Sequence, residues 1–265
     1  MRLRWLPLLT GLLPIVAIHL SLLVAIDARV IPPCFPYLDG CASISATGRY
    51  EPASFVFKPA MMSEWAIMVC YWLLNVAWLR ALAGRAEKTG PVGTAMAAIG
   101  TTGAIALILY ITFLGTQAPF YEFMRRIGIY FYFGGTVIAQ ILLARHTLWW
   151  SRALGLRRLR LIGRSQMVLA LVPFALGALN FVLKSTLADS DPAENVIEWF
   201  VALLMHVCFL LSYAAWRDTG FGGRWVVAID DDRGGPDVRA GQNQALDAAA
   251  AMPSASSSSP SGATE

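Results

Sequence analysis

Apolar residues occur along this chain in six long runs, and short polar segments separate each run from the next. Each run holds about 20 mostly apolar residues, which is the length that an α-helix needs to cross about 30 Å of hydrocarbon. The pattern predicts an all-α polytopic membrane protein, built as a bundle of six transmembrane helices. The predicted spans cover residues 5–26, 60–82, 92–114, 127–144, 165–183 and 195–216.

The longest polar connection between two spans runs from Pro32 to Pro59 and is rich in proline and glycine. Most of the later polar features fall on the same side of the membrane as this first loop, so we interpret that side as the functional face. Cys34 and Cys41 flank a short turn within the loop. If the loop faces an oxidising compartment, a disulfide between them is expected, and two free thiols are the alternative.

The chain changes character after Trp225. A short acidic stretch is followed by a segment that is mostly glycine, alanine, serine and proline. Such a composition does not bury enough apolar surface to fold alone. We therefore expect a membrane domain over residues 1–225 and a disordered cytoplasmic tail over residues 226–265.

Charge is scarce and unevenly distributed. Only 14% of the residues are charged, against about 25% in a soluble domain. The net charge of +4 does not indicate nucleic-acid binding, because most arginines lie in short loops beside the spans. The side with the termini carries roughly fifteen Lys and Arg residues and the other side roughly six, so both termini are expected in the cytoplasm. We expect an integral protein of the plasma membrane with a long first extracytoplasmic loop.

Several charged residues at helix ends lie at a similar depth, near the extracytoplasmic headgroup boundary. Carboxylates and cations mixed at that depth suit a zwitterionic or phosphate headgroup, with Lys184–Glu198 and Arg125–Glu64 as expected pairs, or Arg126 in place of Arg125. Ordinary interfacial charges at helix ends are the alternative for each residue. Tyr71 and Asn75 follow Glu64 on one face of the same predicted helix. The candidate headgroup-binding residues are Glu64, Tyr71, Asn75, Arg125, Arg126, Lys184 and Glu198.

Two histidines, His19 and His206, lie well inside predicted spans. An ionisable group at that depth is costly and is often functional, although a neutral histidine bonded to a neighbouring helix is the alternative. The sequence contains no HExxH motif, no paired CxxC and no GxSxG nucleophile elbow. We therefore predict no metal site and no cofactor, and the sequence identifies no catalytic residue.

Motifs at both ends of the membrane domain resemble a known family. They are Ile44-Ser45-Ala46-Thr47-Gly48 and Glu51–Phe57 in the first loop, with Glu198-Trp199 and Phe209–Tyr213 in the last span. Together they are similar to the damage-regulated autophagy modulator and suppressor-of-four-kinase family. That family also includes the post-GPI-attachment remodelling factors and the amino-terminal membrane part of yeast cell-wall-hypersensitive proteins. The resemblance covers about residues 5–221. The chain has Met124-Arg125-Arg126 where the family often has a histidine.

The resemblance implies a role in the lipid remodelling of GPI anchors, in phospholipid organisation or in autophagy. We expect a non-enzymatic protein that binds lipid headgroups and organises lipids or membrane protein partners. An intramembrane lipid-remodelling enzyme, of the acyl transferase or hydrolase type, is the alternative. A transporter is less favoured, because the sequence shows no duplicated halves. The expected partners are membrane lipids and other membrane proteins, and no nucleic acid.

Overall fold

The computed structural model describes residues 3–186 and 189–222. Within this part the chain is all-α, and six helices are long and apolar enough to cross a membrane, which confirms the predicted fold class. The proposed tail over residues 226–265 lies outside the described residues. The long helices are α1 (Leu6–Asp27), α4 (Ser54–Ala86), α5 (Thr94–Thr112), α6 (Pro119–Ala153), α7 (Arg157–Thr186) and α8 (Asp191–Asp218).

Most of these helices are longer than the apolar runs that predicted them. α4 has 33 residues and α6 has 35, so each is about 50 Å long at 1.5 Å per residue and extends past the hydrocarbon layer. The apolar run marks only the part that hydrocarbon covers. Lysine, arginine and glutamate are good helix formers, so the helix continues through polar sequence beyond that part.

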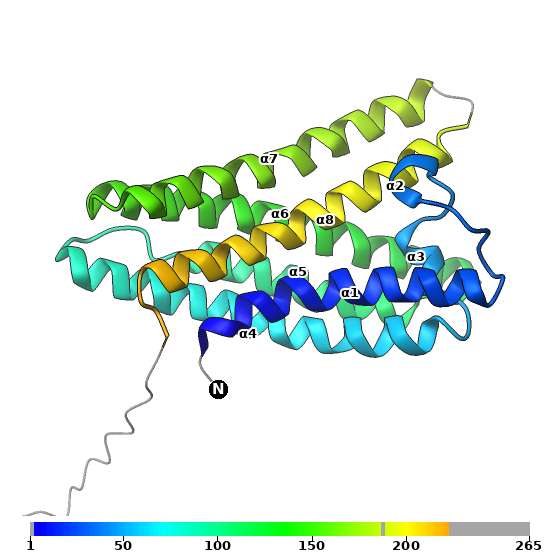
Figure 1. Cartoon of the computed structure of the whole chain (residues 1–265), viewed down its shortest axis with the longest axis horizontal. Coiled ribbons are helices and arrows are strands. Elements are labelled where there is room, and N and C mark those ends of the chain that lie inside the picture. Colours follow the sequence, from blue (N-terminus) through cyan, green and yellow to red (C-terminus); the bar gives the residue numbers. More distant parts are fainter. Residues whose placement is uncertain (1–2, 187–188, 223–265) are drawn as a thin grey trace, which may run out of the picture. The chain divides into compact units, whose positions relative to one another are not determined.

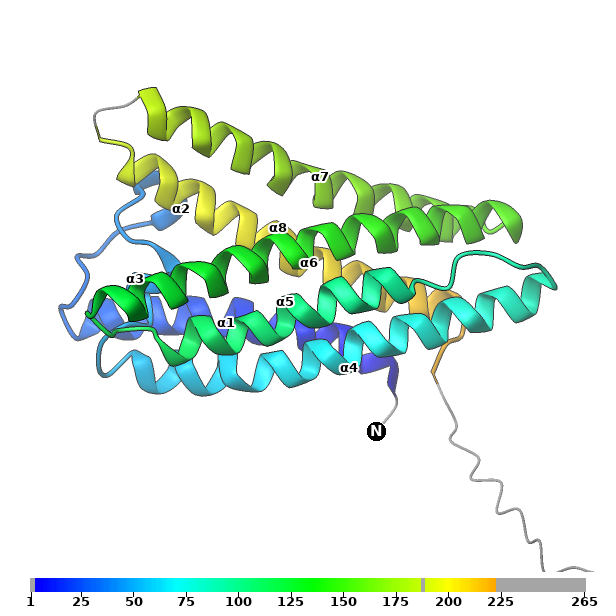
Figure 2. The same cartoon turned by 180° about the vertical axis from the view of Figure 1, so that it is seen from behind.

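The six helices contact one another in chain order around a closed ring. The contacting neighbours are α1–α4, α4–α5, α5–α6, α6–α7, α7–α8 and α8–α1. Figure 1 shows α1 and α8 on the near side of the bundle, and Figure 2 shows α6 between α5 and α7 on the other side. Consecutive long helices run in opposite directions, which suits an up-and-down bundle with short connections.

The two ends of the ring differ. The loop end, as we call it, carries two one-turn helices of the first loop, α2 (Pro36–Asp39) and α3 (Ile44–Thr47). At the opposite end, the terminus end, the 3-10 helix η1 (Leu3–Trp5) precedes α1, and α8 finishes beside it. The stacked rings of Trp5 and Tyr213, with centroids 5.4 Å apart, hold the beginning of α1 against the last part of α8.

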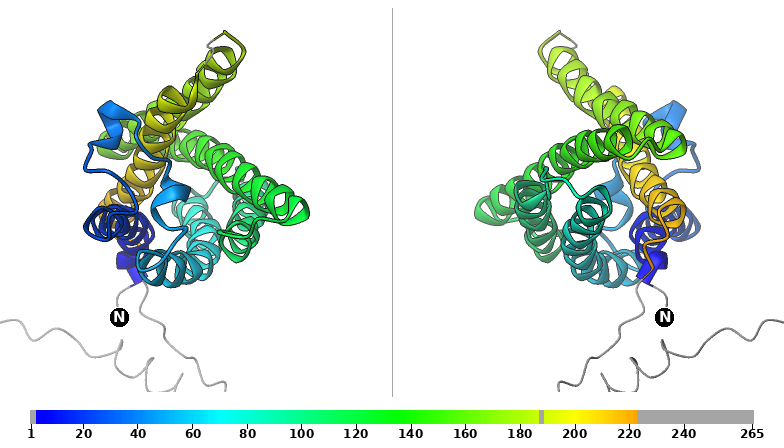
Figure 3. Two further views of the ribbon diagram at one scale, coloured as in Figure 1. Left: turned by 90° about the vertical axis from the view of Figure 1, so that its right-hand side faces the viewer. Right: turned by 90° about the vertical axis from the view of Figure 1, so that its left-hand side faces the viewer.

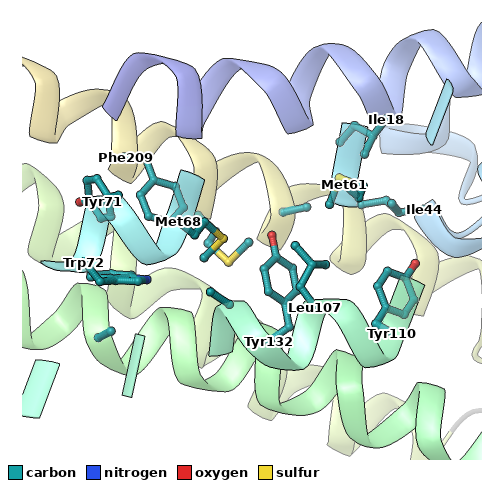
Figure 4. Packing of buried hydrophobic residues seen from close by; sticks show 14 of the residues in the cluster. Ile18, Ile44, Met61, Met68, Tyr71, Trp72, Leu107, Tyr110, Tyr132 and Phe209 are labelled. Atoms are coloured by element: carbon teal, nitrogen blue, oxygen red, sulfur yellow. The ribbon is translucent and has the colours of Figure 1, made fainter. Parts of the chain in front are cut away.

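Aromatic and sulfur-containing side chains fill the middle of the ring. In Figure 4 the rings of Tyr71, Trp72 and Phe209 pack together, and Tyr132 and Tyr110 continue the core toward the loop end. Small residues bring α5 and α6 close together. A Cβ atom added to Gly135 would lie 3.3 Å from the Gly103 Cα atom, so close backbone approach draws these helices together.

α7 is the least enclosed helix. Only 17% of its apolar window is buried, against 44–50% in the other five spans. The end-on views in Figure 3 show α7 projecting away from the other helices. Because a ring of helices has to be filled by side chains, a helix that diverges from its neighbours leaves an open space at its flank. An open groove lies between α7 and its neighbours α6 and α8.

Candidate functional site

The first loop is attached firmly to the beginning of α8. Cys34 and Cys41 are joined by a disulfide that closes the turn around α2. The Asn195 side-chain amide donates to the Gly40 carbonyl at 2.7 Å, and the Trp199 indole N–H donates to the Ala42 carbonyl at 2.8 Å. These bonds satisfy backbone carbonyls where no helix supplies partners, and they hold the first loop over the beginning of α8.

His19 supports the same loop from α1. Its Nδ1 lies 2.7 Å from the Ile15 carbonyl, and its Nε2 lies 3.1 Å from the Tyr37 hydroxyl. With Nδ1 donating to the carbonyl, Nε2 accepts from the hydroxyl. Burial raises the pKa of the Tyr37 hydroxyl above its usual value, which keeps that hydroxyl protonated as a donor at neutral pH. The His19 ring also packs edge-on against Trp199. His19 therefore holds α2 in place.

An open groove of about 690 Å³ lies between α6, α7 and α8 and reaches the first loop. This volume falls within the range of ligand pockets in proteins. α6 and α7 supply the apolar walls, and α3 with its N-cap, the beginning of α8 and one residue of α7 supply a polar end. The walls include Ile129, Phe133, Val137, Ile138, Pro173 and Phe174, and the polar end includes Ser43, Ser45, Asn180, Glu194, Asn195 and Glu198.

Two glycines, which have no side chains, help to keep the groove open. Gly134 on α6 and Gly177 on α7 both line it, and a Cβ atom on either would meet nothing within 4 Å. The divergence of α7 and these two glycines together leave room for a chain-like apolar ligand. The groove runs beside helices whose outer faces are apolar, for example at Phe174, which is 65% exposed.

Glu194 at the polar end already has two partners. The Lys184 ammonium lies 3.1 Å from one carboxylate oxygen, and the Ser190 hydroxyl donates to the other at 2.5 Å. The sequence had suggested a pair between Lys184 and Glu198, but Lys184 pairs with Glu194 instead. Glu198 lies one helical turn further along α8. The Lys184 side chain is 66% exposed, so the pair contributes little to stability.

Glu198 occupies a more enclosed position. Its carboxylate faces the backbone N–H groups of Ile44 and Ser45, with Arg49 as a neighbouring cation. Glu198 lines the groove and also a separate internal cavity of about 20 Å³, and Phe133 lines both as well. These two side chains form the partition between the groove and the interior of the bundle.

A buried polar cluster lies behind this partition. The Tyr132 hydroxyl lies 3.5 Å from His206 Nε2, and His206 Nδ1 lies 2.6 Å from the Ala202 carbonyl. Glu64 is fully buried, and neither of its carboxylate oxygens has a hydrogen-bond partner among the described residues. A buried carboxylate without partners is costly. Glu64 is not among the residues that line the groove.

The remaining candidates lie elsewhere. The Tyr71 hydroxyl lies 2.7 Å from Ser212 Oγ, and the Trp216 indole donates to Asn75 at 3.2 Å, so both α4 residues bond α8 in the core. Arg126 lies 4.0 Å from Glu122 on the same helix, which makes that carboxylate its partner, and Arg125 is half-buried. The structure therefore brings only Glu198, and Lys184 through Glu194, to the groove.

Several groove residues were not anticipated. Asn195 lies three positions before Glu198, so the helical period alone puts both on one face. Ser43 and Ser45 come from the first loop, and Asn180 comes from α7. No pattern along the chain joins these three positions to α8. Within the described ranges no three His, Cys, Asp or Glu residues are placed to hold a metal ion.

The comparisons with known proteins agree with the fold. The sequence model of one family, described as the Frag1/DRAM/Sfk1/Cwh43P N-terminal domain, matches residues 2–218. Comparison with curated proteins and with solved structures finds no match. The matched segment includes all six long helices and the first loop. The chain therefore belongs to the Frag1/DRAM/Sfk1/Cwh43P N-terminal domain family.

Proposed function

We propose that this membrane protein binds a lipid in the groove between α6, α7 and α8 and acts by organising lipids or partner proteins. The acyl chain lies along the apolar walls, and the headgroup lies at the polar end beside α3. The observation that carries the proposal is the pairing of long apolar walls with polar side chains at one end of a single groove. An amphipathic ligand is the class of molecule that satisfies both parts.

The position of the groove supports a lipid as that ligand. α6 and α7 are membrane-spanning helices, so hydrocarbon rather than water surrounds the walls. Pro173 and Asn180 are seven residues apart, or about 10 Å along α7, which places the polar end nearer the membrane surface than the walls. The phospholipid organisation that the family resemblance implies agrees with this reading.

We further propose that the loop end faces the extracytoplasmic side of the plasma membrane and that the terminus end faces the cytoplasm. Arg152 at the end of α6 and Arg157 and Arg158 at the beginning of α7 flank the short connection at the terminus end, and all three are exposed. Excess arginine in short cytoplasmic connections is the usual determinant of orientation. The disulfide of the first loop suits an oxidising compartment.

Photocrosslinking of lipids to the wild-type chain and to a variant with a filled groove tests the proposal. The purified chain is incubated with a mixture of phosphatidylethanolamine, phosphatidylcholine and phosphatidylglycerol that carry a photoactivatable acyl chain, and crosslinks are mapped by mass spectrometry. We expect crosslinks on α6 and α7 around Gly134 and Gly177, and about a tenfold loss of them in a Gly134→Phe and Gly177→Phe double variant. Neither phenylalanine meets a clash at its Cβ atom.

Gly84→Phe is the matched control, because Gly84 is also helical and also has open space around it but lies on α4. It is expected to leave the crosslinks unchanged. Crosslinks spread evenly over the outer faces of all six helices, and insensitive to the two groove phenylalanines, would refute lipid binding in the groove.

The second candidate function is a lipid-remodelling enzyme. The observation that favours it is the unpartnered Glu64 carboxylate in the neighbourhood of Tyr132, whose hydroxyl lies 3.5 Å from His206. A carboxylate held without partners is available for proton transfer. Glu64→Gln and wild-type chains are compared for turnover of labelled phospholipid. Product formation that depends on Glu64 supports the enzyme, and saturable binding without product supports the lipid-binding function.

A further inference from the structure

The polar end of the groove is acidic. Among the described residues that line the groove are two carboxylates, those of Glu194 and Glu198, and no lysine or arginine. Two cations lie near these carboxylates but outside the lining, Lys184 beside Glu194 and Arg49 near Glu198. A phosphate monoester would therefore meet carboxylates before it met a cation. The charge of the groove favours a ligand group that is positive.

The polar end also has acceptor capacity that the described residues leave unused. The Asn195 amide already donates to Gly40, and the Ser43 and Ser45 hydroxyls already bond each other at 3.0 Å. Ser43 also accepts from the Ala46 N–H. Asn180 Oδ1, by contrast, is buried and has no partner among the described residues. The buried Asn180 oxygen can therefore accept from a ligand, and a carboxylate offers about four acceptor sites, more than the partners of Glu194 and Glu198 occupy.

Resting on the proposed function, we propose that the lipid is a zwitterionic phospholipid whose headgroup carries a primary ammonium. That group supplies a positive charge beside the carboxylates that line the groove and an N–H donor for the unpartnered Asn180 Oδ1. A trimethylammonium headgroup supplies the charge but no N–H donor, and a glycerol headgroup supplies hydroxyl donors without a positive charge. The phosphodiester then lies toward the rim of the groove, where Lys184 is the available cation.

Competition between headgroups tests this assignment. The full chain in detergent is loaded with fluorescent, acyl-labelled phosphatidylethanolamine, and unlabelled lipids with identical acyl chains displace it. Phosphatidylethanolamine is expected to compete about ten times better than phosphatidylcholine, since a charge-assisted hydrogen bond separates them. Phosphatidylglycerol and phosphatidic acid are expected to compete more weakly still.

Two variants test which residues cause the preference for phosphatidylethanolamine over phosphatidylcholine. Glu198→Gln keeps the size of the side chain and removes its charge, so phosphatidylethanolamine should bind about tenfold more weakly while phosphatidylcholine is less affected. Asn180→Leu removes the unpartnered acceptor on a separate helix and is expected to act in the same direction. Glu122→Gln, a carboxylate on α6 outside the groove lining, is the control and is expected to change neither affinity.

The outcomes separate this inference from the function on which it rests. Equal competition by all four lipids, with binding still abolished by the two groove phenylalanines, overturns the headgroup assignment and leaves lipid binding standing. Stronger competition by phosphatidic acid, or an ethanolamine preference that survives both Glu198→Gln and Asn180→Leu, also overturns it. Lipid binding that is unchanged in the Gly134→Phe and Gly177→Phe double variant overturns the proposed function together with this inference.

Discussion

Tyr71 and Asn75 place two polar groups in the middle of α4, and each is bonded to α8. The Tyr71 hydroxyl meets Ser212, which also accepts from the Gln166 amide of α7 at 3.0 Å. The Asn75 amide donates to the Tyr71 carbonyl at 2.9 Å and accepts from Trp216. Three helices thus share one network. Polar side chains inside a membrane bundle are useful when they join helices in this way, because hydrocarbon offers them no partner.

Tyr71→Phe tests whether this hydroxyl is structural. The variant removes one hydrogen bond and keeps the ring packing, so the free energy of unfolding should fall by about 1 kcal/mol. Lipid binding to the groove should not change. Unfolding is followed in detergent by circular dichroism, and Tyr50→Phe, at an exposed position, is the control. A loss of lipid binding without a loss of stability would instead return Tyr71 to the ligand site.

At the scale of elements, the first loop is the part of the chain that completes the groove. α3 contributes Ser43, its N-cap, and Ser45 to the polar end. α2 is tied to α1 through His19 and to α8 through Gly40, whose position leaves no room for a side chain, since a Cβ atom there would clash with the Pro192 carbonyl. The disulfide closes the segment between these attachments. The loop is therefore a fixed wall of the site.

Removal of the disulfide tests this role. Cys34→Ser with Cys41→Ser should lower the free energy of unfolding by about 2 kcal/mol, because the closed segment is short. Since the same loop carries Ser43 and Ser45, lipid affinity should also fall severalfold. The double variant is compared with Cys70→Ser, which changes a free cysteine on α4. Affinity that stays at the wild-type value in the double variant would show that the groove does not depend on the loop.

At the scale of the whole described bundle, each of the two ends has its own chemistry. The loop end carries the disulfide, α2, α3 and the polar end of the groove. The terminus end carries the exposed arginines that flank the connection between α6 and α7. A ring of six helices that alternate in direction fixes which connections share an end, so the orientation of any one connection sets the orientation of all of them.

Cysteine labelling tests the proposed orientation. In a background with Cys70→Ala and Cys208→Ala, a membrane-impermeant maleimide should label Tyr50→Cys in intact cells. It should label Arg158→Cys only after the membrane is permeabilised. Tyr50 and Arg158 are both exposed and lie at opposite ends of the bundle. The reverse labelling pattern would place the groove's polar end at the cytoplasmic face.

The sequence by itself determined the fold class, because membrane helices reveal themselves through a local property, the length of an apolar run. It also singled out Glu198, His19 and the two loop cysteines as candidates, with an ordinary alternative left open for each. The helix ends were less accurate, since hydropathy marks hydrocarbon thickness and not where backbone hydrogen bonding stops. α2 and α3 were not predicted, because four-residue helices leave no periodic pattern.

Only the tertiary structure decided which polar groups meet. Lys184 of α7 pairs with Glu194 of α8, and Tyr71 meets Ser212 across 141 positions of sequence. The groove exists because α7 diverges from its neighbours and because Gly134 and Gly177 face the opening. A hydropathy pattern describes each helix alone, whereas a groove is a property of the angle and spacing between helices, which packing sets.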